Sequence, residues 1–79
     1  MIVKLKTIKR ESGNVDSDEM KIGTQFKLHE VTVGRGANLQ YFGEKDKIMI
    51  TPQVENVSIF DRLIKIQTNN TEYLFEMIM

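Results

Sequence analysis

Alternating apolar and polar residues dominate the last third of the chain and predict a β-hairpin there. Aliphatic residues recur at every second position from Leu63 to Thr68, and aromatic residues do the same from Thr71 to Glu76. Period-two alternation is the signature of a half-buried strand. Asn69 and Asn70 separate the runs, and asparagine tolerates the left-handed backbone that a two-residue hairpin turn imposes at both central positions. Other parts of the chain must cover the apolar side of this hairpin, which consists of Ile64, Ile66, Tyr73 and Phe75.

The amino-terminal segment alternates in the same way and predicts a strand from Ile2 to Lys9. Val3, Leu5 and Thr7 face inward in this interpretation, and the lysines between them face water. Two readings of the lysines stay open: a contact for phosphate or an acidic partner, or a charged edge strand protected against unwanted pairing. The candidate contact residues are the basic side chains of this segment and one exposed turn arginine: Lys4, Lys6, Lys9, Arg10 and Arg35.

The middle of the chain predicts further short strands separated by turn-forming residues. From Gln25 to Val33 the apolar positions change parity near His29 or Glu30, which a β-bulge would correct by returning Phe26, Leu28, Val31 and Val33 to one side. The segment 10–20 is rich in turn formers and predicts a mobile loop. Short strands are also expected at 38–42 and at 47–51, the second with Ile48 and Ile50 inward. Val54, Val57 and Ile59 continue the apolar pattern, with another change of parity around Glu55-Asn56.

The ends of the last strands carry their own signals. Pro52, the only proline, marks a boundary between two strands or a corner, and Asp61-Arg62 predicts a turn into the final hairpin. The tail from Met77 to Met79 is apolar. It either extends the last strand over the open end of the core or offers an adhesive surface to a second copy of the chain.

These elements together predict an all-β fold. No stretch shows apolar spacing of three and four residues over a helical length, so no helix is expected. Six to seven short antiparallel strands in one domain over residues 1–79 favour a small barrel or sandwich. Closure into a barrel would hide the edges that a small open sheet exposes.

Composition narrows the class of protein. Apolar residues make up 41% and charged residues 28% of the 79 positions, which is ordinary for a folded soluble domain and argues against a membrane span. The chain has no cysteine, which excludes disulfides and thiolate chemistry and favours a reducing cytoplasm. Lysines interrupt the first residues, so we expect no signal peptide. The formal net charge of zero lacks the basic excess of a dedicated nucleic-acid binder.

Catalytic and metal-binding motifs are absent from the sequence. His29 is the single histidine, and no nucleophile motif, paired metal-binding histidines or phosphate-binding glycine loop accompanies it. Asn14, Asp16 and Asp18 resemble part of a calcium loop, but the glycine and the distal glutamate of that loop are missing at the required spacing. We therefore expect a protein that is not an enzyme, with no catalytic residue, no cofactor and no metal.

The segments Gly23 to Leu28, Thr51 to Val54 and Ile64 to Phe75 resemble a pattern in small uncharacterised proteins of Gram-positive bacteria and their phages, over residues 21–76. The resemblance implies an SH3-like β-barrel and a mobile-element origin, and it implies no catalytic residue.

The leading functional hypothesis is a non-catalytic protein-interaction module, a phage or mobile-element accessory protein that binds a host or virion protein through a strand edge or loop. The alternative is a small barrel that binds nucleic acid through the basic amino-terminal strand, with Tyr41 and Phe42 as stacking faces. A homodimer through the terminal strands is a further expectation. We expect no membrane association.

Overall fold

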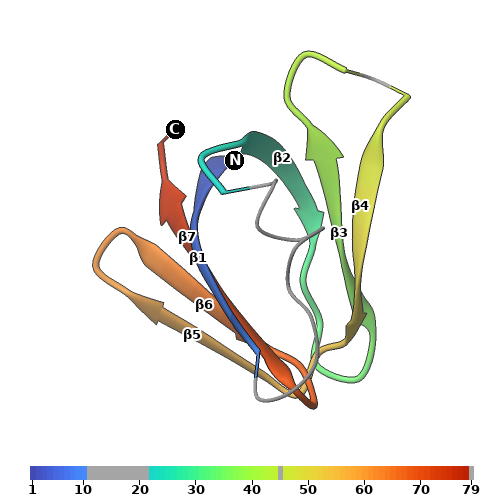
Figure 1. Ribbon diagram of the computed structural model, residues 1–79, viewed down its shortest axis with the longest axis vertical. Helices are drawn as coiled ribbons and strands as arrows, with labels where there is room; N and C mark the ends of the chain where they lie inside the picture. Colours follow the sequence, from blue (N-terminus) through green and yellow to red (C-terminus); the bar gives the residue numbers. More distant parts are fainter. Residues whose placement is uncertain (11–21, 45, 79) are drawn as a thin grey trace.

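The computed structural model describes residues 1–10, 22–44 and 46–78. These residues form one antiparallel sheet of seven strands (Figure 1). Apart from residue 10, the loop expected at 10–20 lies outside the described residues. The strands are β1 (Ile2–Arg10), β2 (Gln25–Glu30), β3 (Gly36–Tyr41), β4 (Ile48–Gln53), β5 (Asn56–Phe60), β6 (Leu63–Gln67) and β7 (Thr71–Met77).

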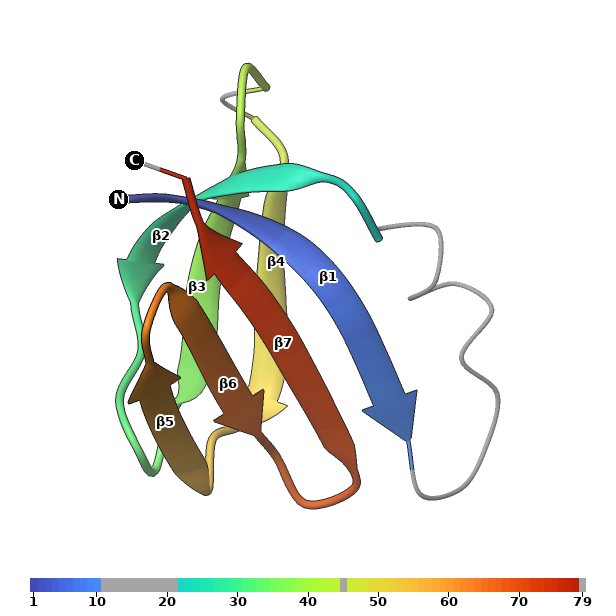
Figure 2. The same ribbon diagram turned by 90° about the vertical axis from the view of Figure 1, so that its left-hand side faces the viewer.

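The strand order places the two ends of the chain in the middle of the sheet. The order is β4-β3-β2-β1-β7-β6-β5, so β1 pairs with both β2 and β7. The sheet curls until β5, β6, β7 and β1 form a layer in front of β3 and β4 (Figure 2). The all-β prediction is confirmed. Within the described residues the sheet stays open, because β4 and β5 stand at opposite edges of the strand order and do not pair.

The core lies between the two layers. Phe26 of β2 meets Phe75 of β7 edge to face, with ring centroids 6.2 Å apart, an arrangement that aromatic pairs prefer. The predicted apolar side of the final hairpin is buried, as expected. The buried apolar side chains are Val3, Leu5, Phe26, Ala37, Leu39, Met49, Val54, Ile64, Ile66, Tyr73 and Phe75.

Bulges in β1 and β2 change which residues face the core. In β1 the pairing with β7 shifts between Leu5 and Thr7, so Thr7 is exposed and Ile8 packs against the core instead. The inward placement predicted for Thr7 was therefore wrong. An extra residue in one strand reverses the parity of everything after it.

The bulge predicted near His29 is present. The pairing of β2 with β3 shifts between Leu28 and Glu30, and Val31 then packs against the core. The strand ends at Glu30, and Val33 is exposed in the following turn rather than returned to the inner side.

Strand β4 buries the face opposite to the one predicted. Met49 faces Leu39 across the β3–β4 pair and is buried, whereas Ile48 and Ile50 are exposed. Thr51 is also buried; its hydroxyl accepts the Ala37 amide proton at 2.9 Å and donates to the Pro52 carbonyl at 2.8 Å. These two hydrogen bonds satisfy a buried hydroxyl and fix the inward parity of the strand.

One of the two predicted hairpin turns differs from expectation in its backbone conformation. The turn at Asp61-Arg62 is present, and Asp61 adopts a left-handed backbone with φ of 59°. Asn69 and Asn70 form the other turn without positive φ, so the left-handed conformation predicted there was wrong. That turn is closed by Thr68, whose amide donates to the Thr71 carbonyl at 2.8 Å and whose hydroxyl donates to the same oxygen at 3.2 Å.

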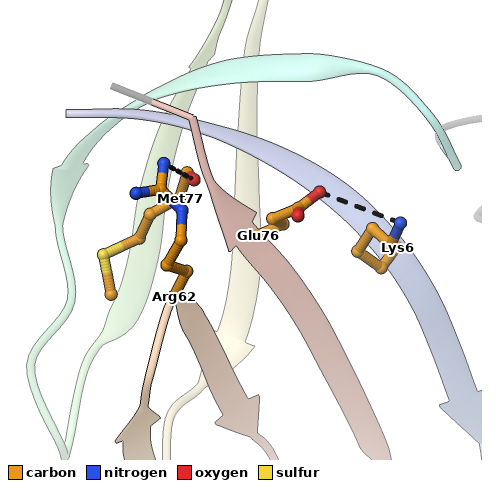
Figure 3. Close-up of polar contacts among 4 residues, drawn as sticks. All are labelled: Lys6, Arg62, Glu76 and Met77. Atoms are coloured by element: carbon orange, nitrogen blue, oxygen red, sulfur yellow. Dashed lines mark hydrogen bonds and ion pairs between the residues drawn. The ribbon is translucent and has the colours of Figure 1, made fainter.

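The apolar tail extends the final strand. The Met77 amide donates to the Arg62 carbonyl at 2.7 Å, and the Ile78 amide donates to the Ile2 carbonyl at 2.8 Å. The Arg62 guanidinium donates back to the Met77 carbonyl at 2.8 Å (Figure 3). Arg62 thereby ties the β5–β6 turn to the end of β7. Met79 lies outside the described residues.

Candidate functional site

The basic residues of β1 lie on a central strand beside the acids of β7. Lys4 is paired in register with Glu76, and Lys9 with Glu72. The Lys6 ammonium lies 3.8 Å from the Glu76 carboxylate (Figure 3). The interpretation of β1 as a protected edge strand was therefore wrong at Lys4, where β2 and β7 pair with β1 on both sides. Beyond Leu5, β1 pairs with β7, and no described strand pairs with its other side. Opposite charges on neighbouring strands weaken the field that the lysines would project toward a phosphate.

Arg10 and Arg35 occupy different surroundings from the lysines. The Arg10 Nε donates to the Thr71 hydroxyl at 3.2 Å. Burial raises the pKa of the Tyr73 phenol, and the charge of Arg10 partly offsets this shift. Arg35 is exposed in the turn before β3, on the other half of the sheet. The structure thus does not gather the five predicted contact residues into one patch, and nucleic-acid binding stays a prediction.

Of the residues considered for stacking or catalysis, Tyr41 and His29 make contacts with other side chains, whereas Phe42 is exposed. Tyr41 packs against the Phe26 ring at 4.8 Å between centroids and has the Lys47 ammonium over its own ring at 4.8 Å. Phe42 is exposed in the turn after β3. His29 is exposed, and its Nε2 lies 2.9 Å from the amide oxygen of Gln40.

The described residues contain neither a cluster of metal-ligating side chains nor a membrane-spanning helix. Over residues 1–10, 22–44 and 46–78, no three histidine, aspartate or glutamate side chains gather as metal ligands would. No helix in this part of the chain has the length and apolar character needed to cross a membrane.

The free edge of β5 offers backbone groups for pairing. Phe60 and Leu63 flank the two-residue turn and face each other in the β5–β6 ladder. A two-residue turn makes its flanking residues a hydrogen-bonded pair, and such pairs alternate with non-hydrogen-bonded pairs along an antiparallel ladder. The N–H and C=O groups of Val57 and Ile59 therefore point away from β6. No other strand of the described chain pairs with that side.

Apolar side chains line the same edge on both faces of the sheet. Ile59 has the inward parity of Ile64, its partner on β6, yet it is 66% exposed. Phe60 on the outer face is 78% exposed. A shallow groove on this outer face runs from β5 to β7 and is lined by Ser58, Phe60, Leu63, Lys65 and Leu74.

Charges near this edge are unevenly placed. Asn56–Phe60 contains no charged residue and no proline, whereas Glu55 and Asp61 flank it. Lys65 lies on β6 with its side chain in the outer groove. We call the free side of β5 together with this groove the β5 docking edge.

Sequence reasoning did not identify the β5 docking edge. The apolar run at Val57 and Ile59 indicated a core strand, and nothing local reports that a strand lies at a sheet edge. The available signal was negative: β5 lacks the lysines and prolines with which edge strands are usually protected.

Comparison with known proteins adds no functional assignment to this geometry. No family model, curated protein or solved structure matches the chain.

Proposed function

We propose that the protein is a non-catalytic interaction module that binds an extended segment of a partner protein as an eighth strand on the β5 docking edge. The observation that supports this most is the coincidence of free backbone groups at Val57 and Ile59 with the exposed side chains of Ile59 and Phe60. In strand addition, main-chain hydrogen bonds supply affinity and side-chain pockets supply specificity.

The apolar side chains account for the energetic gain. Full burial of an isoleucine or phenylalanine contributes roughly 1.5–3 kcal/mol, and Ile59 and Phe60 are exposed enough to gain a large part of it. An added strand also covers an edge that would otherwise template uncontrolled pairing.

The proposal is tested by selecting binders from a library of displayed dodecapeptides. A lysine at Ile59 would place a charge on the inner face of the edge strand, which is a way in which natural edge strands avoid pairing. It should abolish capture of the selected peptides. Ile50→Lys is the matched control, because Ile50 is 67% exposed on the other edge strand and Ile59 is 66% exposed.

Two results would count against the proposal. The first is a library that yields no saturable binder. The second is equal retention of the selected peptides by the Ile59→Lys and Ile50→Lys variants. Circular dichroism of both variants checks that each still folds as a β protein.

The wider assignment belongs to the same proposal. We retain an SH3-like relationship, an accessory role in a phage or other mobile element, and a cytoplasmic location as its parts. Identification of the neighbouring genes tests the origin: phage structural or regulatory genes on both sides would support it, and a conserved metabolic operon would oppose it.

A further inference from the structure

The partner segment can be described by its chemistry if the proposed function holds. We infer that the segment docking on β5 carries a carboxylate opposite Ser58 and an apolar side chain opposite Phe60. This inference rests on the proposed strand addition at the β5 docking edge. It adds which side chains of the partner segment the outer groove would select.

The position of Lys65 supplies the charge part of the inference. In the register of the sheet, Lys65 lies between Ser58 of β5 and Leu74 of β7. Phe60, Leu63 and Leu74 make the surrounding groove mostly apolar. Lys65 is half-buried, and it forms no ion pair with a carboxylate of the described residues. An ammonium in such surroundings favours an incoming carboxylate over a neutral or basic group.

Ser58 makes the lysine reachable from a new strand. An added strand would lie about 4.8 Å beyond β5 and about 10 Å from β6. Ser58 stands directly between Lys65 and that new strand on the outer face. Because the serine side chain is short, a glutamate or aspartate opposite it can extend over it toward the Lys65 ammonium.

Phe60 supplies the apolar part. Phe60 lies two residues after Ser58 on the same face and is 78% exposed. The residue that docks opposite it gains contact with this ring, which itself faces Leu63 of β6 in the groove. Between the two outer positions, one residue faces inward beside Ile59, where an apolar side chain also fits. An antiparallel partner passes Phe60 first, then Ile59 and then Ser58. Its sequence in the amino-to-carboxyl direction is therefore apolar, apolar, acidic.

A second copy of this chain fits the edge poorly. When two β5 strands pair about a two-fold axis at Ser58, Glu55 of each copy meets Asp61 of the other, which is repulsive. In that register Ser58 lies opposite Ser58 of the second copy. If the two-fold axis passes through Ile59 instead, Ser58 lies opposite Phe60 of the second copy. Neither serine nor phenylalanine supplies a carboxylate for Lys65, so we infer that the occupant is a different, acidic segment.

The experiment selects the same displayed dodecapeptide library in parallel on the unmodified chain and on four variants. Lys65→Glu reverses the groove charge, and Lys65→Met keeps its apolar stem. Lys27→Glu is the matched control, because Lys27 is an exposed strand lysine on the other half of the sheet. Ile59→Lys reports whether capture uses the β5 docking edge at all.

We expect the unmodified chain and Lys27→Glu to enrich the apolar, apolar, acidic pattern, and Lys65→Glu to enrich lysine or arginine at the acidic position. A selected acidic peptide should bind Lys65→Glu about tenfold more weakly than the unmodified chain, and exchange of its acid for lysine should restore binding.

Other outcomes overturn the inference in distinguishable ways. If Ile59→Lys abolishes capture but Lys65→Glu selects the same peptides as the unmodified chain, strand addition stands and the charge selectivity is wrong. If no peptide depends on Ile59, the proposed function fails together with the inference.

Discussion

The two edges of the sheet expose isoleucine equally but differ in how they are protected. Ile50 on β4 is 67% exposed, and Ile59 on β5 is 66% exposed. Strand β4 contains Pro52, which cannot donate a backbone hydrogen bond, whereas β5 contains neither a proline nor a charge. Prolines and charges are the usual means by which natural edge strands avoid further pairing. Side-chain exposure alone therefore does not distinguish a protected edge from an available one.

Close packing against β3 also sets β4 apart. A side chain at Gly36 would collide with the Thr51 carbonyl oxygen of β4. The Thr51 hydroxyl also holds the start of β3 through the Ala37 amide. Strand β5 is held by a regular ladder with β6 and by the turn at Asp61-Arg62. Strand β4 is thus fixed by specific contacts with β3, whereas β5 is held by a regular ladder on one side only.

The largest expected difference in stability is between proline substitutions at two neighbouring positions of β5. Ser58→Pro removes an N–H that the ladder directs toward β6 and should lower the free energy of unfolding by about 3 kcal/mol. Ile59→Pro removes an N–H that faces the free side and should cost only about 1 kcal/mol, mainly through backbone strain. Urea unfolding measures both. Equal losses, or a larger loss for Ile59→Pro, would contradict the assigned hydrogen-bond directions.

The next effect tests the contacts that fix β4. Gly36→Ala places a methyl group against the backbone of Thr51, which cannot rotate away, and should destabilise the fold by about 2 kcal/mol. Ser58→Ala on β5 is the control and should stay within about 0.5 kcal/mol of the original chain. Thermal unfolding of the two variants compares them, and similar midpoints would refute the close approach at Gly36.

A smaller effect tests how the β5–β6 turn is anchored. Arg62→Ala loses the hydrogen bond from the guanidinium to the Met77 carbonyl and should cost about 1 kcal/mol. Arg35 is also an exposed turn arginine, so Arg35→Ala is the control and should be close to neutral. Chemical denaturation distinguishes them; an unaffected Arg62→Ala variant would show that the anchor contributes no stability.

The smallest effect lies at the centre of the sheet, away from both edges. Glu76→Gln removes the ion pair with Lys6, whose two side chains are 44% and 41% exposed. Exposed pairs of this kind contribute at most about 1 kcal/mol, so we expect a loss below about 0.5 kcal/mol that vanishes in 1 M salt. A loss that persists at high salt would mean that Glu76 acts by something other than its charge.

Local patterns were sufficient for some elements of the fold. The final hairpin followed from alternation over adjacent residues, and its four inward side chains are buried. The bulge near His29 followed from a parity change within one strand. Both are short-range features that a single segment records in its own sequence.

Other features depend on partners distant in the sequence. Ile48 and Ile50 were assigned to the inward face of β4, but pairing with β3 decides the parity and buries Met49 and Thr51. The bulge in β1 was missed because Thr7 fits either face. The β5 docking edge was missed because strand order sets which strands are edges, and β4 and β5 are consecutive in sequence yet lie at opposite edges.

Amide hydrogen exchange on the free protein, followed residue by residue by NMR, tests the open edge of β5 most directly. The Ser58 and Phe60 amides, which point into the β5–β6 ladder, should exchange slowly. The Val57 and Ile59 amides should exchange at least about tenfold faster, because solvent is their acceptor. Equal protection of all four amides would contradict the account, since it would mean that the outer side of β5 is already paired.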